Sequence, residues 1–179
     1  MSTDPVVLIT GATGDFGPHV VRAFAADGAR LALTARKLEP AEALIRDLGL
    51  SADRALPSVV DVTSAASVAA WIEAVKQKWS RADVLVNIAG GYKPGKPVHE
   101  MDEADWDFML NLNARSAFLT CRAVIPSTID TPGNRAAQPD ADTSKWVKPE
   151  DLAAVIVFLA SEAANAIHGT LIPVYGRGG

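Results

Sequence analysis

The chain has little of what marks a secreted, membrane or nucleic-acid-binding protein. Its one cysteine, Cys121, excludes an internal disulfide and suits a reducing compartment, so we expect a cytoplasmic protein. The longest apolar run, residues 152–160, is far shorter than the roughly 20 residues of a transmembrane helix. The start has no signal-peptide pattern, and a net charge of −4 without a basic block argues against nucleic acid or an anionic membrane as a partner.

Short apolar runs alternate with amphipathic segments through most of the 179 residues. Strands are expected at residues 6–9, 31–34, 59–62, 84–86 and 170–174, and helices at 18–26, 40–48, 64–79, 101–125 and 149–163. This alternation predicts a single α/β domain over residues 1–179, a doubly wound, Rossmann-like parallel sheet covered on both faces. Ligands bind such sheets at the carboxyl ends of the strands. Residues 127–148 have no clear period and predict a long loop.

A glycine-rich turn, residues 10–17, follows the first expected strand and opens the first expected helix. Gly11 allows a tight turn, Gly14 lets the backbone approach a diphosphate, and Gly17 lets helix and strand pack closely. The helix N-terminus adds free N–H groups and a positive dipole end. This pattern predicts dinucleotide binding, the alternative being a plain strand-to-helix turn. Asp15 counts against binding, because a carboxylate repels a diphosphate unless it points outward.

This turn resembles the T-G-x-x-G-x-x-G variant found in short-chain dehydrogenases/reductases, although the family more often has a glycine at the position of Asp15. Residues 61–62 resemble the family's adenine contact, and residues 87–90 resemble its N-N-A-G motif. Residues 106–113 resemble the helix whose Asn belongs to the active site. The resemblance implies a Rossmann fold, a nicotinamide dinucleotide as cofactor, and oxidoreduction of a small carbonyl or alcohol.

The resemblance also implies which residues contact the cofactor: Gly11, Thr13, Gly14, Phe16, Gly17, Arg36, Asp61, Val62, Asn87, Ala89, Gly90, Ile129 and Thr131. Arg36 stands where an acidic residue would accept hydrogen bonds from the adenosine ribose and favour NAD. A guanidinium can instead pair with the 2′-phosphate of NADP. We therefore favour NADP, with NAD as the alternative. The other interpretation of Arg36 is a solvated surface arginine.

A junction at residues 126/127 separates two landmarks of this family. Residues 126–132 resemble the P-G-x-I-x-T-P loop that contacts nicotinamide, yet they follow directly on the helix expected to end at residue 125. In the family, a Ser, a Tyr and a Lys that serve proton transfer lie between these landmarks, on a strand and helix of about 30 residues or more. The sequence therefore predicts an internal deletion. It leaves about five strands in the order 3-2-1-4-last, with residues 170–174 pairing beside the fourth.

Few catalytic groups remain. Asn113 is the survivor of the family's active-site set, and without its partners we expect its side chain to bond backbone or water. Tyr92 and Lys96 have the Tyr-x-x-x-Lys spacing, but two prolines and a glycine in residues 92–97 exclude a regular helix, so the match is interpreted as accidental. Tyr92 is instead expected at the mouth of the cofactor cleft. The three histidines lack ligand spacing, so no metal site is expected.

Three hypotheses follow for function. The chain is a shortened NADP-binding member of the lineage that has lost turnover. Alternatively, it is an active NADP-dependent oxidoreductase, by unusual residues or because this sequence omits a segment of the real chain. In the third, it is a non-catalytic binding module or an inactive truncated product. A homo-oligomer would need a non-standard interface, because one of the two helices that usually build the family's dimer interface is missing.

Overall fold

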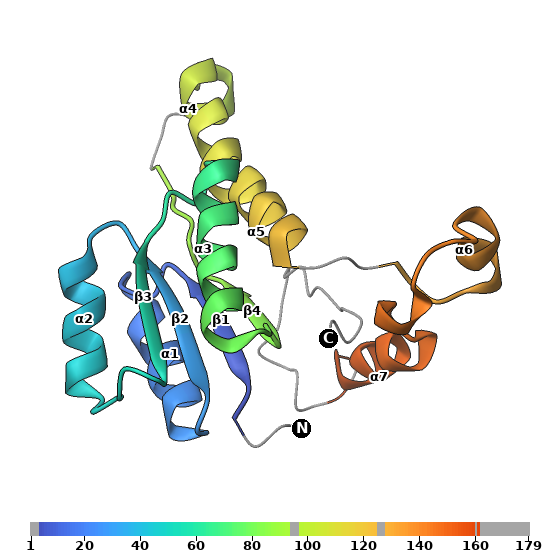
Figure 1. Ribbon diagram of the computed structural model, residues 1–179. Coiled ribbons are helices and arrows are strands. Elements are labelled where there is room, and N and C mark those ends of the chain that lie inside the picture. The colour runs from blue at the N-terminus through green and yellow to red at the C-terminus, as the bar shows by residue number, and fades with distance from the viewer. Residues whose placement is uncertain (1–3, 94–96, 125–127, 160, 162–179) are drawn as a thin grey trace. The chain divides into compact units, whose positions relative to one another are not determined.

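The structure is a computed structural model that describes residues 4–93, 97–124, 128–159 and 161. The chain divides into two units, Met1–Val124 and Ile125–Gly179. The first unit carries a parallel sheet with helices on both faces (Figure 1). Within the described residues, none of the helices combines the length and the apolar character needed to cross a membrane.

Four short runs form the sheet of the first unit: β1 Val6–Thr10, β2 Arg30–Ala35, β3 Ala55–Val59 and β4 Val84–Asn87. All neighbouring strands are parallel and their order is β3-β2-β1-β4, with Leu8 paired to Ala32 on one side and to Leu85 on the other. β1 is buried along its whole length, as expected of a continuous apolar run in a sheet covered on both faces. The predicted α/β fold and the order of the first four strands are confirmed. The strand predicted at residues 170–174 lies outside the described residues.

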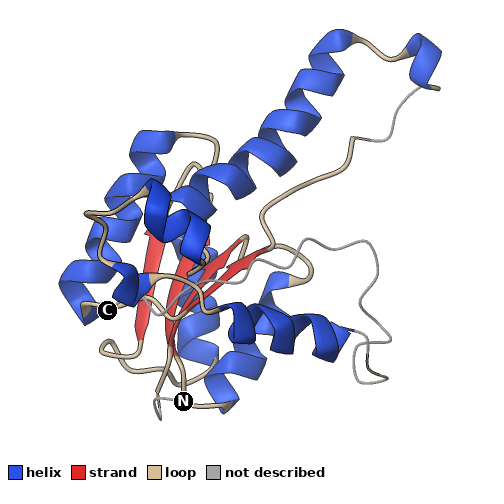
Figure 2. Ribbon diagram, turned by 90° about the vertical axis from the view of Figure 1, so that its right-hand side faces the viewer, coloured by secondary structure: helices blue, strands red, loops and turns tan. Residues whose placement is uncertain are grey.

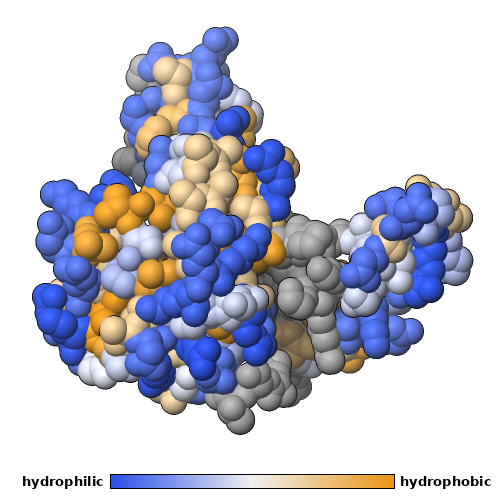
Figure 3. Space-filling model, in the orientation of Figure 1, coloured by the Kyte–Doolittle hydropathy of each residue, from blue (hydrophilic) through white to orange (hydrophobic). Residues whose placement is uncertain are grey.

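The third strand lies earlier than predicted. β3 spans Ala55–Val59, whereas the sequence indicated residues 59–62. Val60 and Val62 are buried, at 6% and 9% exposure, but they lie beyond the ladder, so their apolar signal was mistaken for strand pairing. Val59 itself is 60% exposed, and Figure 3 shows apolar side chains gathered beside the hydrophilic outer surface of α2, over β3.

Helices cover both faces of the sheet, as predicted (Figures 1 and 2). On one face α1 Gly17–Ala26 and α2 Leu38–Asp47 pack Val21 and Leu44 against Ile9. On the other face, α3 Ala65–Trp79 and α5 Ser116–Val124 contribute the side chains of Trp71, Val75 and Leu119 to a core that includes Leu8. Each such buried side chain stabilises the fold by about 1.5–3 kcal/mol. The Ser64 side chain caps α3 by accepting a hydrogen bond from the Ser67 N–H at 3.4 Å, which confirms the predicted start.

The helix predicted over residues 101–125 is continuous but not uniformly α-helical. A 3-10 turn, η1 Val98–Glu100, precedes it. The segment then runs as α4 Glu103–Met109, the π-helical η2 Leu110–Arg115, and α5. π-helical turns are rare and occur frequently at functional sites.

The second unit corrects the prediction of a featureless loop over residues 127–148. It contains α6 Pro132–Ala137, a 3-10 turn η3 Thr143–Lys145, and an isolated parallel bridge between Ile129 and Val147. α6 forms because Thr131 caps it, accepting a hydrogen bond from the Asn134 N–H at 3.2 Å, and because Pro132 suits a first helical position. These signals are local and have no period. α7 begins at Pro149, as predicted, and is described to Leu159.

Candidate functional site

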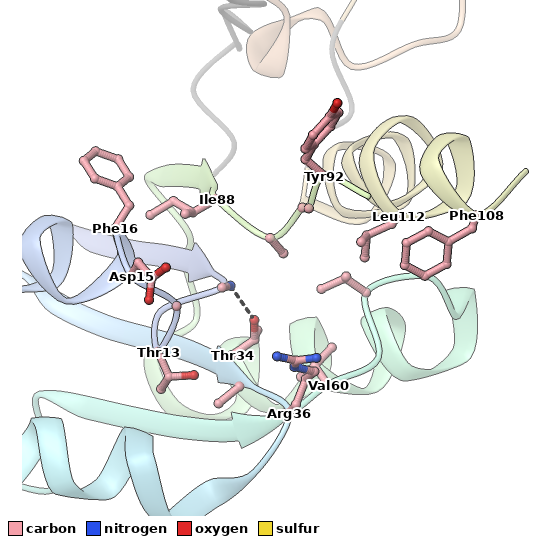
Figure 4. A pocket seen from close by; sticks show the side chains of 17 residues that line it. Thr13, Asp15, Phe16, Thr34, Arg36, Val60, Ile88, Tyr92, Phe108 and Leu112 are labelled. Carbon is pink, nitrogen blue, oxygen red and sulfur yellow. Dashed lines mark hydrogen bonds between the residues drawn. The ribbon is translucent and has the colours of Figure 1, made fainter. Parts of the chain in front are cut away.

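A cavity of about 550 Å³ lies in the first unit at the carboxyl ends of the strands. Its wall consists of residues 11 and 13–16 of the glycine turn, residues 34–36 at the end of β2, Val60 and Val62 after β3, residues 88–92 after β4, and Phe108 and Leu112 on the helical segment (Figure 4). Eight of the predicted cofactor residues line it: Gly11, Thr13, Gly14, Phe16, Arg36, Val62, Ala89 and Gly90. Val60, Phe108 and Leu112 were not predicted as site residues, although the position of Val60 directly after β3 and of the other two on the helical segment after β4 was available as a signal.

The glycine turn requires its first and last glycines. Gly11 has a φ of +67°, and a Cβ there would lie 2.7 Å from the backbone nitrogen of Ala89. A Cβ on Gly17 would lie 2.4 Å from the Gly11 carbonyl oxygen, so this glycine lets α1 begin directly against the turn. Gly14 would accept a Cβ at ordinary contact distance, 3.5 Å from the nearest heavy atom. At Gly14, therefore, the missing side chain leaves backbone open to the cavity.

Two buried threonines hold the turn and the loop after β4 in place. The Thr10 Oγ1 accepts hydrogen bonds from the backbone N–H groups of Ile88 and Ala89, both at 3.1 Å. The Thr34 Oγ1 accepts one from the Gly11 N–H at 3.3 Å. Both threonines are at most 2% exposed. Neither threonine was predicted as a site residue, and the available signal was a hydroxyl at the end of an otherwise apolar strand.

Asn87 lies beside the cavity rather than in its wall. Its Oδ1 accepts hydrogen bonds from the Thr10 and Thr120 hydroxyls, at 3.3 and 2.8 Å, and its Nδ2 lies 3.6 Å from the Sγ of Cys121. The side chain therefore joins β1 and β4 to α5. The Thr10 hydroxyl also accepts hydrogen bonds from the N–H groups of Ile88 and Ala89, so Asn87 supports the loop after β4 through Thr10.

Asp61 also supports the cavity without lining it. Its Oδ1 accepts hydrogen bonds from the Thr63 hydroxyl at 2.7 Å and from the Thr63 N–H at 2.9 Å. These bonds favour the ionised carboxylate and hold the pKa of Asp61 below its usual value. The carboxylate thus fixes the turn after β3, and the flanking Val60 and Val62 face the cavity.

Asn113 lies in the π-helical segment and clamps the loop after β4. Its Oδ1 accepts a hydrogen bond from the Gly91 N–H at 3.0 Å, and its Nδ2 donates to the carbonyl oxygens of Gly91 and Met109, both at 2.9 Å. A Cβ on Gly90 would lie 2.7 Å from the Asn113 Oδ1, which explains the glycine there. The expectation that this side chain bonds backbone is confirmed.

Two opposite charges lie in the cavity wall. Figure 4 shows Asp15 in the glycine turn, between Thr13 and Phe16, and Arg36 near Thr34 and Val60. Within the described part of the chain, neither charged side chain has an ion pair or hydrogen bond. Tyr92 lines the cavity and is 79% exposed, which confirms its predicted place at the mouth.

Ile129 and Thr131 belong to the second unit and have partners there. The Ile129 carbonyl oxygen accepts a hydrogen bond from the Asn134 Nδ2 at 2.8 Å, and Thr131 caps α6. Beside them, Arg135 donates to Asp130 at 2.7 Å and holds the pKa of that carboxyl below its usual value. The junction at 126/127 lies outside the described residues, as does Lys96.

Comparison with known proteins gives one consistent family. Residues 5–136 match the family model of the short chain dehydrogenases. The chain is 40% identical over 119 residues to the D-threitol dehydrogenase of Mycolicibacterium smegmatis, covering 66% of this chain and 45% of that protein. It is 32% identical over 125 residues to an NADP-dependent 3-hydroxy acid dehydrogenase of Salmonella typhi, covering 70% and 49%.

A solved structure extends the likeness to the fold. The crystal structure of a short-chain dehydrogenase/reductase from Burkholderia xenovorans superposes with a TM-score of 0.61 at 34% identity, covering 70% of this chain and 52% of that one. The chain thus spans about half the length of the curated relatives it matches.

Proposed function

The chain belongs to the short-chain dehydrogenase family, and we propose that its first unit binds NADP(H) in the cavity at the carboxyl ends of the strands. One observation carries the proposal: an open glycine turn ahead of α1 and the guanidinium of Arg36 line the same cavity. Exposed backbone N–H groups at a helix N-terminus favour a diphosphate. Arg36 offers planar donors to a further phosphate.

The lining suggests how the dinucleotide lies. The adenine occupies the apolar end between Val62, Leu112 and Phe108, and the 2′-phosphate lies at Arg36. The diphosphate lies on the glycine turn. The nicotinamide then extends toward Ile88, in the loop that Thr10 and Asn113 hold.

The preference for NADP over NAD rests on Arg36. Within the described residues its guanidinium has no carboxylate partner, and it stands where an acidic residue would favour NAD. The Salmonella typhi relative is named as NADP-dependent. NAD remains the alternative cofactor.

We infer that turnover is impaired. The family's reaction needs a Ser, a Tyr and a Lys for proton transfer, and the sequence passes from one flanking landmark to the other without the segment that carries them. Asn113 has both polar atoms of its side chain engaged with backbone. The second candidate is an active oxidoreductase of small carbonyls or alcohols whose catalytic segment is omitted from this sequence. Intact mass distinguishes omission from deletion, and NADPH consumption with a panel of small aldehydes and ketones tests turnover, for which we expect none.

The binding proposal is tested by Arg36→Gln, which removes the charge while keeping a polar side chain. Hydrogen bonds to charged groups contribute about 1.5–3 kcal/mol, so NADPH affinity should fall by roughly 10- to 100-fold. NADH affinity should stay within about twofold, since NADH has no 2′-phosphate. Arg46→Gln, on the exposed surface of α2 and outside the cavity wall, is the matched control and should change neither. Equal loss for both nucleotides, or no loss, contradicts the assignment of Arg36.

A further inference from the structure

The cavity has a carboxylate where the proposed ligand carries its diphosphate. Asp15 lies in the glycine turn and lines the cavity, between Thr13 and Phe16 (Figure 4). We propose that Asp15 lowers the affinity of the cavity for every dinucleotide, so that tight binding of a dinucleotide depends on the contact between Arg36 and its 2′-phosphate. This inference rests on the proposed function and names what determines its ligand selection.

Near Asp15, the glycine turn has few groups that attract a diphosphate. The N–H of Gly14 is already bonded to the Gly11 carbonyl oxygen at 3.1 Å. Within the described residues, the N–H groups of Asp15 and Phe16 have no acceptor, so they are free to bind an anion. A helix N-terminus is equivalent to roughly half a positive charge. The negative charge of the Asp15 carboxylate opposes that attraction.

Within the described residues, Asp15 has no ion-pair partner that would relieve the repulsion at the turn. Among the described lining residues, the other charged group is Arg36, at the end of β2 near Val60 (Figure 4), and it is not paired with Asp15. Asp15 is exposed and, within the described residues, has no cation that would neutralise it. Its carboxylate therefore acts on the part of the ligand that NADPH and NADH share.

The two residues then have separable effects. Asp15 weakens both nucleotides by the same factor, because both contain the diphosphate. Arg36 strengthens only the nucleotide that has a 2′-phosphate. Arg36 therefore sets the ratio of the two affinities, and Asp15 lowers both affinities, so that NADH is left with the repulsion and without the compensating contact.

The test measures dissociation constants of NADPH and NADH for the wild type, Asp15→Asn and Asp15→Gly. Asparagine keeps the size of the side chain and removes its charge. For an exposed charge close to a diphosphate, we expect both nucleotides to bind about tenfold more tightly in both variants, with the NADPH-to-NADH ratio unchanged. Asp47→Asn, on the exposed end of α2 and outside the cavity wall, is the matched control and should leave both constants unchanged.

The outcomes separate this inference from the proposed function. If the wild type binds NADPH and Asp15→Asn binds both nucleotides no more tightly, the inference is wrong and the proposed function stands. A gain for one nucleotide alone also overturns it, because a diphosphate effect must be shared. If neither nucleotide binds to a folded wild type or to Asp15→Asn, the proposed function fails as well.

Discussion

Thr10 offers the sharpest test of how the site is held together. Its hydroxyl accepts two backbone hydrogen bonds at 3.1 Å, from Ile88 and Ala89, and donates to Asn87 at 3.3 Å. Thr10→Val keeps the shape of the side chain but places a methyl group against two N–H donors. A fully buried donor left unsatisfied costs about 1–3 kcal/mol; these two donors are partly buried, so we take about 1–2 kcal/mol for each and expect the free energy of unfolding to fall by about 2–4 kcal/mol.

Losing these hydrogen bonds should also affect the cavity, because Ala89 lines the cavity and the Ala89 N–H is one of the two donors. We therefore expect NADPH to bind at least severalfold more weakly to Thr10→Val under conditions where the variant is still folded. Thr10→Ser is the matched control, since it retains the hydroxyl and removes only a methyl group. Urea unfolding followed by circular dichroism gives the stabilities. A Thr10→Val variant within about 0.5 kcal/mol of Thr10→Ser would show that these hydrogen bonds do not stabilise the fold.

Two further predictions concern the turns around the cavity. Gly11→Ala should abolish nucleotide binding and destabilise the fold by more than Gly49→Ala, because both glycines have positive φ but only at Gly11 would the new Cβ strike backbone, 2.7 Å from the Ala89 nitrogen. The left-handed strain common to both is about 1–2 kcal/mol, so equal losses in thermal melts would contradict this view of the turn. Asp61 should titrate below its ordinary pKa of 3.8, because Thr63 bonds its ionised form. Its bonds to Thr63 therefore stabilise the fold above that pH, and this contribution is lost as the pH falls through the lowered value. Carboxyl chemical shifts followed by NMR should show the Asp61 pKa return toward its ordinary value in Thr63→Val, and an unchanged pKa there would count against the hydrogen bonds.

The sequence predicted the architecture of the first unit because burial and pattern agree there. Continuous apolar runs indicated β1, β2 and β4, and the helix expected over residues 64–79 corresponds to α3, which Ser64 caps. The error at β3 arose because Val60 and Val62 are buried beyond the ladder, and composition alone does not distinguish pairing from packing. α6 was missed because a capping threonine and a proline, rather than periodicity, specify it.

The site could be predicted only in part from the sequence. Glycines and Arg36 could be placed in the cavity because they stand at strand ends, where the topology collects them. The orientation of polar side chains could not be read in this way. Asn87 turns toward Thr120 on α5, a residue 33 positions away in the chain. That contact depends on how α5 packs on the sheet, which no local pattern encodes.

The most direct test of the central claim is a calorimetric titration of the wild-type chain with NADPH and, separately, with NADH. We expect NADPH to bind at a single site and at least about tenfold more tightly than NADH, since a charge-assisted contact to the 2′-phosphate contributes about 1.5–3 kcal/mol. Equal affinities, or no heat from either nucleotide with a chain that melts cooperatively, would contradict it.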